Sequence, residues 1–169
     1  MYIETECKFV LWCKISKLIC REAVILGIVY IPPEYTSYSS PDAFGQIETE
    51  YMQLITNYKN IVLVGDFNAR TAEEKDYIFL EDYEFGDDLQ GISINEVCNL
   101  DIFGIPCRRT SKDKGKNRYG NFLLDFCKGN NVFIMNGRLG KDQIDNFTCR
   151  NASVVDYCLS NVNFFRETC

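Results

Sequence analysis

The sequence predicts a single α/β domain, because strand-like and helix-like patterns alternate along a chain of 169 residues. Two apolar runs rich in β-forming residues, Lys8–Ile15 and Val24–Ile31, are separated by a short polar stretch, which favours an antiparallel pair. Hydrophobic residues make up 46% of the chain and aromatic residues 14%. This composition excludes wholesale disorder and is typical of a packed core.

A helix is expected after the second of these strands. Pro32 and Pro33 end the strand, and Ser39 or Ser40 can cap a helix that begins near Pro41. Apolar residues at helical spacing continue to about Asn57; they are Phe44, Ile47, Tyr51, Leu54 and Ile55. A buried strand over Ile61–Val64 follows at once.

The second half of the chain repeats the alternation. A long polar segment to about Ile94 predicts a loop-rich excursion. A helix is expected over 117–128, with Gly129 as its C-terminal stop, and a strand over 132–135 comes next. Two short strands near 146–150 and 153–159 are predicted to form a hairpin.

Charge is unevenly distributed around a net value of −6. Eight acids against one lysine lie between residues 73 and 88, which predicts a solvated loop. Six bases against Asp113 lie between residues 108 and 118. This basic run has two open interpretations, a nucleic-acid contact or solvated surface, since net charge constrains a focused site less than it constrains non-specific binding.

The nine cysteines include no Cys-x-x-Cys pair, and the sequence contains no histidine that could complete a zinc site. We interpret them as reduced packing residues. No stretch has the length of a membrane span and no signal peptide is recognisable. We therefore expect an intracellular protein, cytoplasmic or nuclear, with no membrane association.

The run Ile61–Arg70 carries the first candidate site residues. Strand alternation would place the side chains of Asp66 and Asn68 on one side and Phe67 in the core. A carboxylate and a carboxamide on one rim can orient a water and hold a phosphate oxygen. The alternative is that these are ordinary turn residues at the end of a strand.

Several segments, in order, resemble the endonuclease/exonuclease/phosphatase superfamily, and their pattern is most similar to the endonuclease domains of LINE-type retrotransposons. The segments are Val29–Pro33, Val64–Arg70, Asn117–Gly120, Leu124–Cys127, Phe133–Gly137, Thr148 and Ser153–Tyr157. The resemblance implies an α/β fold that is part of a four-layer α-β-β-α sandwich, in which two mostly antiparallel sheets have helices outside. It also implies that residues 1–169 are one truncated domain, without the first strands that carry a metal-ligating Glu and without a last strand that carries Ser-Asp-His.

The resemblance further implies hydrolysis of DNA phosphodiester bonds with Mg²⁺ as cofactor and DNA as partner. Tyr30 would contact the scissile phosphate, Asp66 would orient or deprotonate the attacking water, and Asn68 would donate to a phosphate oxygen. Asp156 would hold a catalytic histidine. No metal ligand is assigned in this chain. For Tyr30, closure of a strand before two prolines is the alternative role.

Four further residues are candidates for nucleic-acid binding. Asn136, Thr148 and Ser153 match cleft positions of the retrotransposon relatives, and each is also a plausible turn or strand-end residue. Arg70 follows the strand end and could reach a phosphate, although a surface role is the default for an arginine.

The leading functional hypothesis is therefore a metal-dependent DNA endonuclease domain of retroelement type. We expect this chain alone to be inactive or nearly so, because general acid–base groups typically contribute about 10²- to 10⁴-fold and the family's histidine is absent. Two alternatives are a phosphatase of the same superfamily and a non-catalytic nucleic-acid-binding or degenerate remnant.

Overall fold

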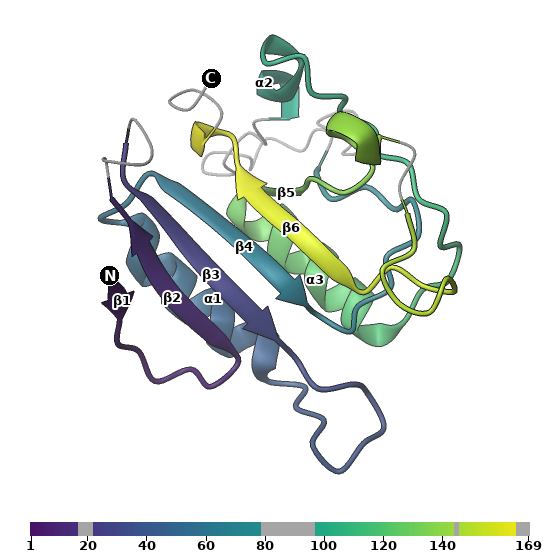
Figure 1. Cartoon of the computed structure of the whole chain (residues 1–169), viewed down its shortest axis with the longest axis horizontal. Coiled ribbons are helices and arrows are strands. Elements are labelled where there is room, and N and C mark those ends of the chain that lie inside the picture. Colours follow the sequence, from purple (N-terminus) through teal and green to yellow (C-terminus); the bar gives the residue numbers. More distant parts are fainter. Residues whose placement is uncertain (17–21, 79–96, 144–145, 165–169) are drawn as a thin grey trace, which may run out of the picture.

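The computed structural model describes residues 1–16, 22–78, 97–143 and 146–164 as one six-stranded sheet with helices packed against it (Figure 1). In chain order the elements are β1 (Tyr2–Ile3), β2 (Val10–Ile15), β3 (Val24–Tyr30), α1 (Ala43–Ile55), β4 (Asn60–Asp66), α2 (Val97–Ile102), α3 (Arg118–Asn130), β5 (Val132–Ile134), η2 (Gly140–Asp142) and β6 (Asp156–Asn161). The α/β prediction is confirmed.

The strand order is β1-β2-β3-β4-β6-β5. β3 and β4 run parallel, joined by α1 as the crossover, and every other neighbouring pair is antiparallel. The predicted antiparallel pair of β2 and β3 is confirmed, with Val10 opposite Val29 and Ile15 opposite Val24.

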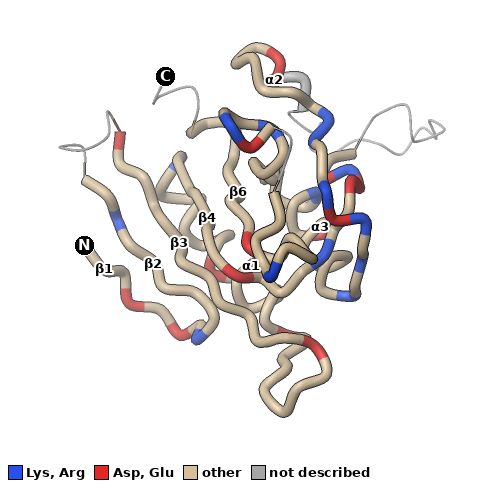
Figure 2. The backbone as a smooth tube through the Cα atoms, turned by 45° about the vertical axis from the view of Figure 1, so that its right-hand side comes forward, with Lys and Arg blue, Asp and Glu red and all other residues tan. Residues whose placement is uncertain are grey.

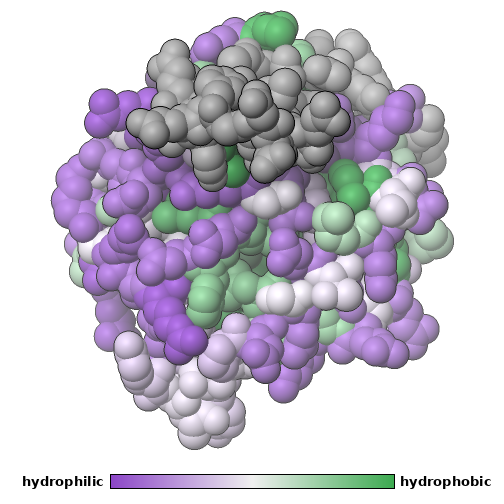
Figure 3. All heavy atoms as spheres, turned by 180° about the vertical axis from the view of Figure 1, so that it is seen from behind, coloured by the Kyte–Doolittle hydropathy of each residue, from purple (hydrophilic) through white to green (hydrophobic). Residues whose placement is uncertain are grey.

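Helices α1 and α3 lie side by side on one face of the sheet, behind the strands in Figure 1. Their aromatic side chains meet edge to face: the ring centroids of Phe44 and Tyr119, and those of Tyr51 and Phe126, are each 5.5 Å apart. Such pairs add about 0.5–1.5 kcal/mol each beyond area burial. Figure 3 views this side and shows polar side chains around a hydrophobic recess. Phe44 and Phe122 help to line a groove between the two helices.

Gly27 lets the sheet and its core pack closely. A Cβ atom at this position would lie 2.6 Å from the Trp12 ring and 2.7 Å from Leu63, its neighbours on either side. Trp12 is fully buried, and its Nε1 donates to Glu50 of α1 at 2.8 Å. The missing side chain thus makes room for the largest ring of the core.

The opposite face of the sheet is covered only in part: at the β5 end, Phe133 is buried with Leu100 of α2, and over β2 and β3 no described helix covers it. Leu11 and Ile28, register partners on β2 and β3, are each 45% exposed there. The described residues therefore form one sheet with α1 and α3 on one face and α2 at the β5 end of the other, and the second sheet of the expected sandwich is not among them. Within the described ranges, no helix has the length and apolar character needed to cross a membrane.

Both predicted long helices exist, but their ends differ from expectation. α1 begins after Asp42, so neither Ser39 nor Ser40 caps it with a side chain. α3 runs past Gly129 and ends at Asn131, which adopts the left-handed conformation (φ 52°) that often terminates helices. Its N-cap is Asn117, whose side chain accepts from the backbone N–H of Gly120.

The predicted hairpin over 146–159 is only partly correct. Residues 153–155 precede the strand β6, and the stretch 146–150 is a loop with one β-bridge to them, between Cys149 and Ser153. Arg150 and Asn151 both have positive φ, which breaks strand geometry there. The sequence patterns did not indicate β1, α2 or η2, and most of the predicted excursion before Ile94 lies outside the described residues.

Candidate functional site

Three of the predicted site residues form one row across adjacent strands. Tyr30 of β3 is the register partner of Asp66 of β4, and Asp66 is the register partner of Asp156 of β6. Directly opposed residues point to the same face of a sheet. Because Ile61 and Leu63 of β4 face the helices, alternation places Asp66 on the open face. The row therefore lies at the end of the open face.

The two carboxylates of the row influence one another. Partial burial raises the pKa of Asp66 above its usual value, and the negative charge of Asp156 raises it further. Hydrogen bonds from Asn68 oppose these effects. A carboxylate with a raised pKa is a stronger base than an ordinary aspartate.

Asn68 lies beside Asp66, but through a turn rather than through strand alternation. β4 ends at Asp66, and Asn68 adopts φ 47°, so the alternation argument holds for the buried Phe67 and not for Asn68. The backbone N–H of Asn68 donates to Oδ1 of Asp66 at 2.8 Å. Its Nδ2 donates to the carbonyl of Ile31 at 2.8 Å, which ties the end of β4 to the end of β3.

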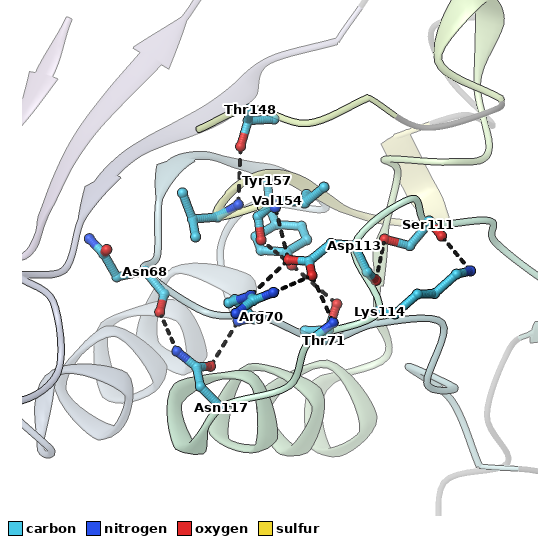
Figure 4. Close-up of polar contacts among 12 residues, drawn as sticks. Asn68, Arg70, Thr71, Ser111, Asp113, Lys114, Asn117, Thr148, Val154 and Tyr157 are labelled. Carbon is cyan, nitrogen blue, oxygen red and sulfur yellow. Dashed lines mark hydrogen bonds and ion pairs between the residues drawn. The ribbon is translucent and has the colours of Figure 1, made fainter. Parts of the chain in front are cut away.

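Asn117 holds the same turn from the other side, and sequence reasoning did not assign it to the site. Its Nδ2 donates to the carbonyl of Asn68, and its Oδ1 accepts from the backbone N–H groups of Arg70 and Gly120, each at 2.8 Å (Figure 4). A Cβ atom on Gly120 would lie 1.9 Å from the Arg70 carbonyl, so glycine permits this contact. The preference of Asn for helix N-cap positions is the sequence signal that could have singled out Asn117.

Asn136 and Thr148 position Asp156 through its backbone. Oγ1 of Thr148 accepts from the N–H groups of Val155 and Asp156 at 3.0 and 3.1 Å. Asn136 donates its Nδ2 to the Asp156 carbonyl at 3.2 Å and accepts from the N–H of Cys158 at 2.8 Å. The polar side-chain atoms of both predicted nucleic-acid ligands thus form hydrogen bonds with the backbone around Asp156.

Ser153 contributes backbone contacts, since its carbonyl accepts from the N–H groups of Thr148 and Cys149 at 3.0 Å each. These bonds close the loop that brings Thr148 against the start of β6. The structure therefore brings Ser153 near the row, with its backbone shaping the loop.

The side chain of Arg70 forms an ion pair with Asp113. Its guanidinium donates to both oxygens of Asp113, at 2.6 and 2.9 Å, and the same carboxylate accepts from the backbone N–H groups of Gly115 and Val154 (Figure 4). The Asp113 side chain is only 2% exposed. Asp113 thus connects the segment after β4 with the segment before β6, and the guanidinium of Arg70 is engaged there.

Two of the six bases in segment 108–118 pair with acids of the segment after β4, and a third donates to a threonine there. Lys114 contacts Glu73 at 2.9 Å and Lys116 contacts Glu74 at 3.4 Å. Arg109 is buried and donates to Thr71 Oγ1 at 2.7 Å. In Figure 2 the blue and red stretches alternate on this side of the molecule. Of the two interpretations of the basic run, these contacts favour a structural role for the paired bases.

The described residues supply two neighbouring carboxylates at the row and no group of three or more His, Cys, Asp or Glu side chains that could hold a metal ion. Mg²⁺ is commonly held through one or two carboxylates and keeps several waters. Asp66 and Asp156 therefore fit Mg²⁺ as a partial ligand set. The histidine expected against Asp156 has no counterpart in this sequence.

Comparisons with protein-family models, with curated proteins and with solved structures each gave no match.

Proposed function

We propose that this chain carries part of the active centre of a metal-dependent DNA phosphodiesterase of the endonuclease/exonuclease/phosphatase type. The observation that carries the proposal is the row of Tyr30, Asp66 and Asp156 across three strands. These residues belong to separate motifs of the resemblance, and the register places them side by side. The open apolar face around Leu11 and Ile28 leaves room for the second sheet that the resemblance implies.

Each residue of the row has a role that its chemistry supports. Asp66 orients the attacking water, the role that the resemblance implies for it. The hydroxyl of Tyr30, whose side chain is exposed, donates to a phosphate oxygen. Asn68 fixes the Asp66 carboxylate by donating to its Oδ1.

Asp66 and Asp156 would together hold Mg²⁺. When bound, the ion supplies charge neutralisation at the phosphate and at the leaving oxygen. A DNA substrate suits an open row better than a small phosphoester does, because a small substrate needs a compact basic pocket and the paired bases of 108–118 do not offer one.

The absence of histidine makes a direct test possible. The chain is incubated with supercoiled plasmid and Mg²⁺, with and without added imidazole, which replaces the missing acid–base group. We expect little or no nicking without imidazole and a rate that rises with imidazole concentration. The Asp66→Ala and Asp156→Asn variants should lose the imidazole-dependent rate by about 10²-fold or more.

A second measurement keeps the test informative if rescue is weak. Mn²⁺ should broaden the NMR signals of residues around Asp66 and Asp156 selectively, and Asp156→Asn should abolish this broadening. Asp125→Asn is the matched control, because Asp125 is an exposed acid on α3. Absence of both selective broadening and imidazole-dependent nicking would reject the proposal.

A further inference from the structure

The loop of residues 31–42, between β3 and α1, projects beyond the end of the sheet that carries the row. Figures 1 and 2 both show it standing clear of the remaining chain. Two tyrosines of this loop face solvent: Tyr35 is 96% exposed and Tyr38 is 79% exposed. Tyr30, at the base of the loop, is 58% exposed. The projection therefore presents aromatic rings beside the candidate active centre.

The base of the loop is fixed to that centre. The N–H of Ile31 donates to the carbonyl of Asp66 at 2.9 Å, and Asn68 donates to the carbonyl of Ile31 at 2.8 Å. At the other end, the N–H of Ser40 donates to the hydroxyl of Tyr119 on α3 at 3.2 Å. One end of the loop is thus held by residues of the row's own turn, and the other by helix α3.

The backbone of the loop holds Tyr35 in an unfavourable conformation. Its φ is 61°, in the left-handed region, which is unfavourable for a residue with a bulky side chain. Thr36 Oγ1 donates to the carbonyl of Pro33 at 2.9 Å and Ser39 N donates to the carbonyl of Thr36 at 3.1 Å, so local bonds maintain the turn. Strain of this kind concentrates at ligand clamps and switch regions.

We propose that Tyr35 and Tyr38 stack on unpaired bases of the DNA strand that the row acts on. This inference rests on the proposed function. Exposed aromatic rings favour bases because stacking needs only a π-face, and paired bases in a duplex keep their faces covered. Beyond Ile31 the loop carries Pro, Ser, Thr, Tyr and the acids Glu34 and Asp42, without aliphatic or basic side chains, so contact with a nucleotide strand would run through the rings rather than through phosphate pairing.

The reach of the loop limits where the stacked bases lie. Tyr35 is five residues from Tyr30, which is at most about 18 Å of extended chain. At about 3.4 Å per stacked nucleotide, Tyr35 contacts bases within about five nucleotides of the phosphate at Tyr30. The loop therefore favours substrates that are single-stranded or locally unpaired close to the cleavage position.

The test compares binding of the whole chain to three fluorescent probes at one salt concentration: a short oligothymidylate, an abasic oligonucleotide of equal length, and a duplex. The abasic strand keeps the phosphates and lacks the rings. We expect the oligothymidylate to bind more tightly than either other probe. Tyr35→Gly and Tyr38→Ala should each weaken that binding by between about fivefold and 150-fold and leave abasic binding unchanged.

The variants separate stacking from folding. Glycine is unstrained at φ 61°, so Tyr35→Gly removes the ring while relieving the backbone. Tyr38→Phe should retain binding, because the ring does the stacking. Tyr2→Ala, which removes a 56% exposed tyrosine from β1, is the matched control and should bind normally.

Equal binding of the oligothymidylate and the abasic strand would overturn the inference, and so would a loss in Tyr2→Ala equal to that in Tyr38→Ala. The result is separable from the proposed function. Imidazole-dependent nicking without base-dependent binding retains the function and rejects the stacking loop. Base-dependent binding without nicking retains the loop and counts against the catalytic proposal.

Discussion

Asp66 and Asp156 face one another across β4 and β6 as register partners, although ninety residues separate them in the chain. Two acids at directly opposed positions repel one another, and the pKa of Asp66 is raised by burial and by this neighbour. The arrangement destabilises the fold in the absence of a cation. Such local cost is typical of sites that bind or react.

We predict that Asp66→Asn stabilises the chain at neutral pH. A raised pKa in the folded state means that the stabilising contribution of Asp66 is fully present below the unfolded pKa and is lost as pH rises through the folded pKa. At neutral pH the ionised carboxylate is therefore unfavourable. The gain should not exceed about 1 kcal/mol, because water screens a half-exposed charge.

Urea unfolding of both proteins at several pH values measures this effect. The stability advantage of Asp66→Asn should be largest above the folded pKa of Asp66 and should shrink as pH falls toward its unfolded value of about 3.9. An advantage that grows on acidification would contradict the assignment. Added Mg²⁺ should narrow the difference by stabilising the unsubstituted chain.

Asp113→Asn should destabilise the chain by about 1–3 kcal/mol. The substitution removes the charge that pairs with Arg70 and replaces one acceptor oxygen with a donor that faces N–H groups. Burial by itself raises the pKa of Asp113, but the bonds from Arg70 and the backbone outweigh burial and hold that pKa below its usual value. The contribution of the Asp113 carboxylate to folding stability is therefore present above the pKa of Asp113 in the unfolded chain, and it is lost as pH falls through the pKa of Asp113 in the folded chain.

Thermal unfolding at pH 7 and at pH values below the folded pKa of Asp113 tests this sign. The two proteins should differ at neutral pH and converge in acid, where the native carboxyl is protonated as well. Lys114→Ala, which removes an exposed pair with Glu73 and a hydrogen bond to the Ser111 carbonyl, is the control and should cost less than about 1 kcal/mol. A difference between Asp113→Asn and the unsubstituted chain that persists unchanged in acid would show that charge is not its cause.

Asp76 and Arg138 form a fully buried ion pair, and breaking it from one side should cost about 3–5 kcal/mol. Oδ2 of Asp76 accepts from Nη1 of Arg138 at 2.6 Å and from the backbone N–H of Ile134 at 2.7 Å. The guanidinium also donates to the carbonyl of Pro106 at 2.9 Å. The pair therefore joins the segment after β4, the segment after α2, and β5.

A double-mutant cycle measures the coupling. Asp76→Leu and Arg138→Met should each be strongly destabilising in urea unfolding, since each leaves an unpaired charge in the core. The double variant should lose less than the sum of the two. Additive losses would mean that the charges do not depend on one another.

The strands β2, β3 and β4 and the helices α1 and α3 follow from apolar periodicity, which records burial on one face. Tyr30, Asp66 and Asp156 were located from their motifs, but their alignment depends on the crossover through α1 and on the β4–β6 register, which no local pattern encodes. Asp76 and Asp113 sit within charged runs that suggest solvated surface, so their burial could not be inferred from composition.

Leu11 and Ile28 should make the isolated chain associate with itself. The two side chains are register partners on the open face and each is 45% exposed, which places apolar surface where no described element covers it. We expect Leu11→Lys with Ile28→Lys to reduce concentration-dependent association in sedimentation velocity. The fold should remain, because both side chains already contact water. The matched control is Met52→Lys, which removes a 52% exposed apolar side chain from α1 on the other side of the sheet and should leave association unchanged. If both variants reduce association equally, general surface charge is the cause and the open face has no special role.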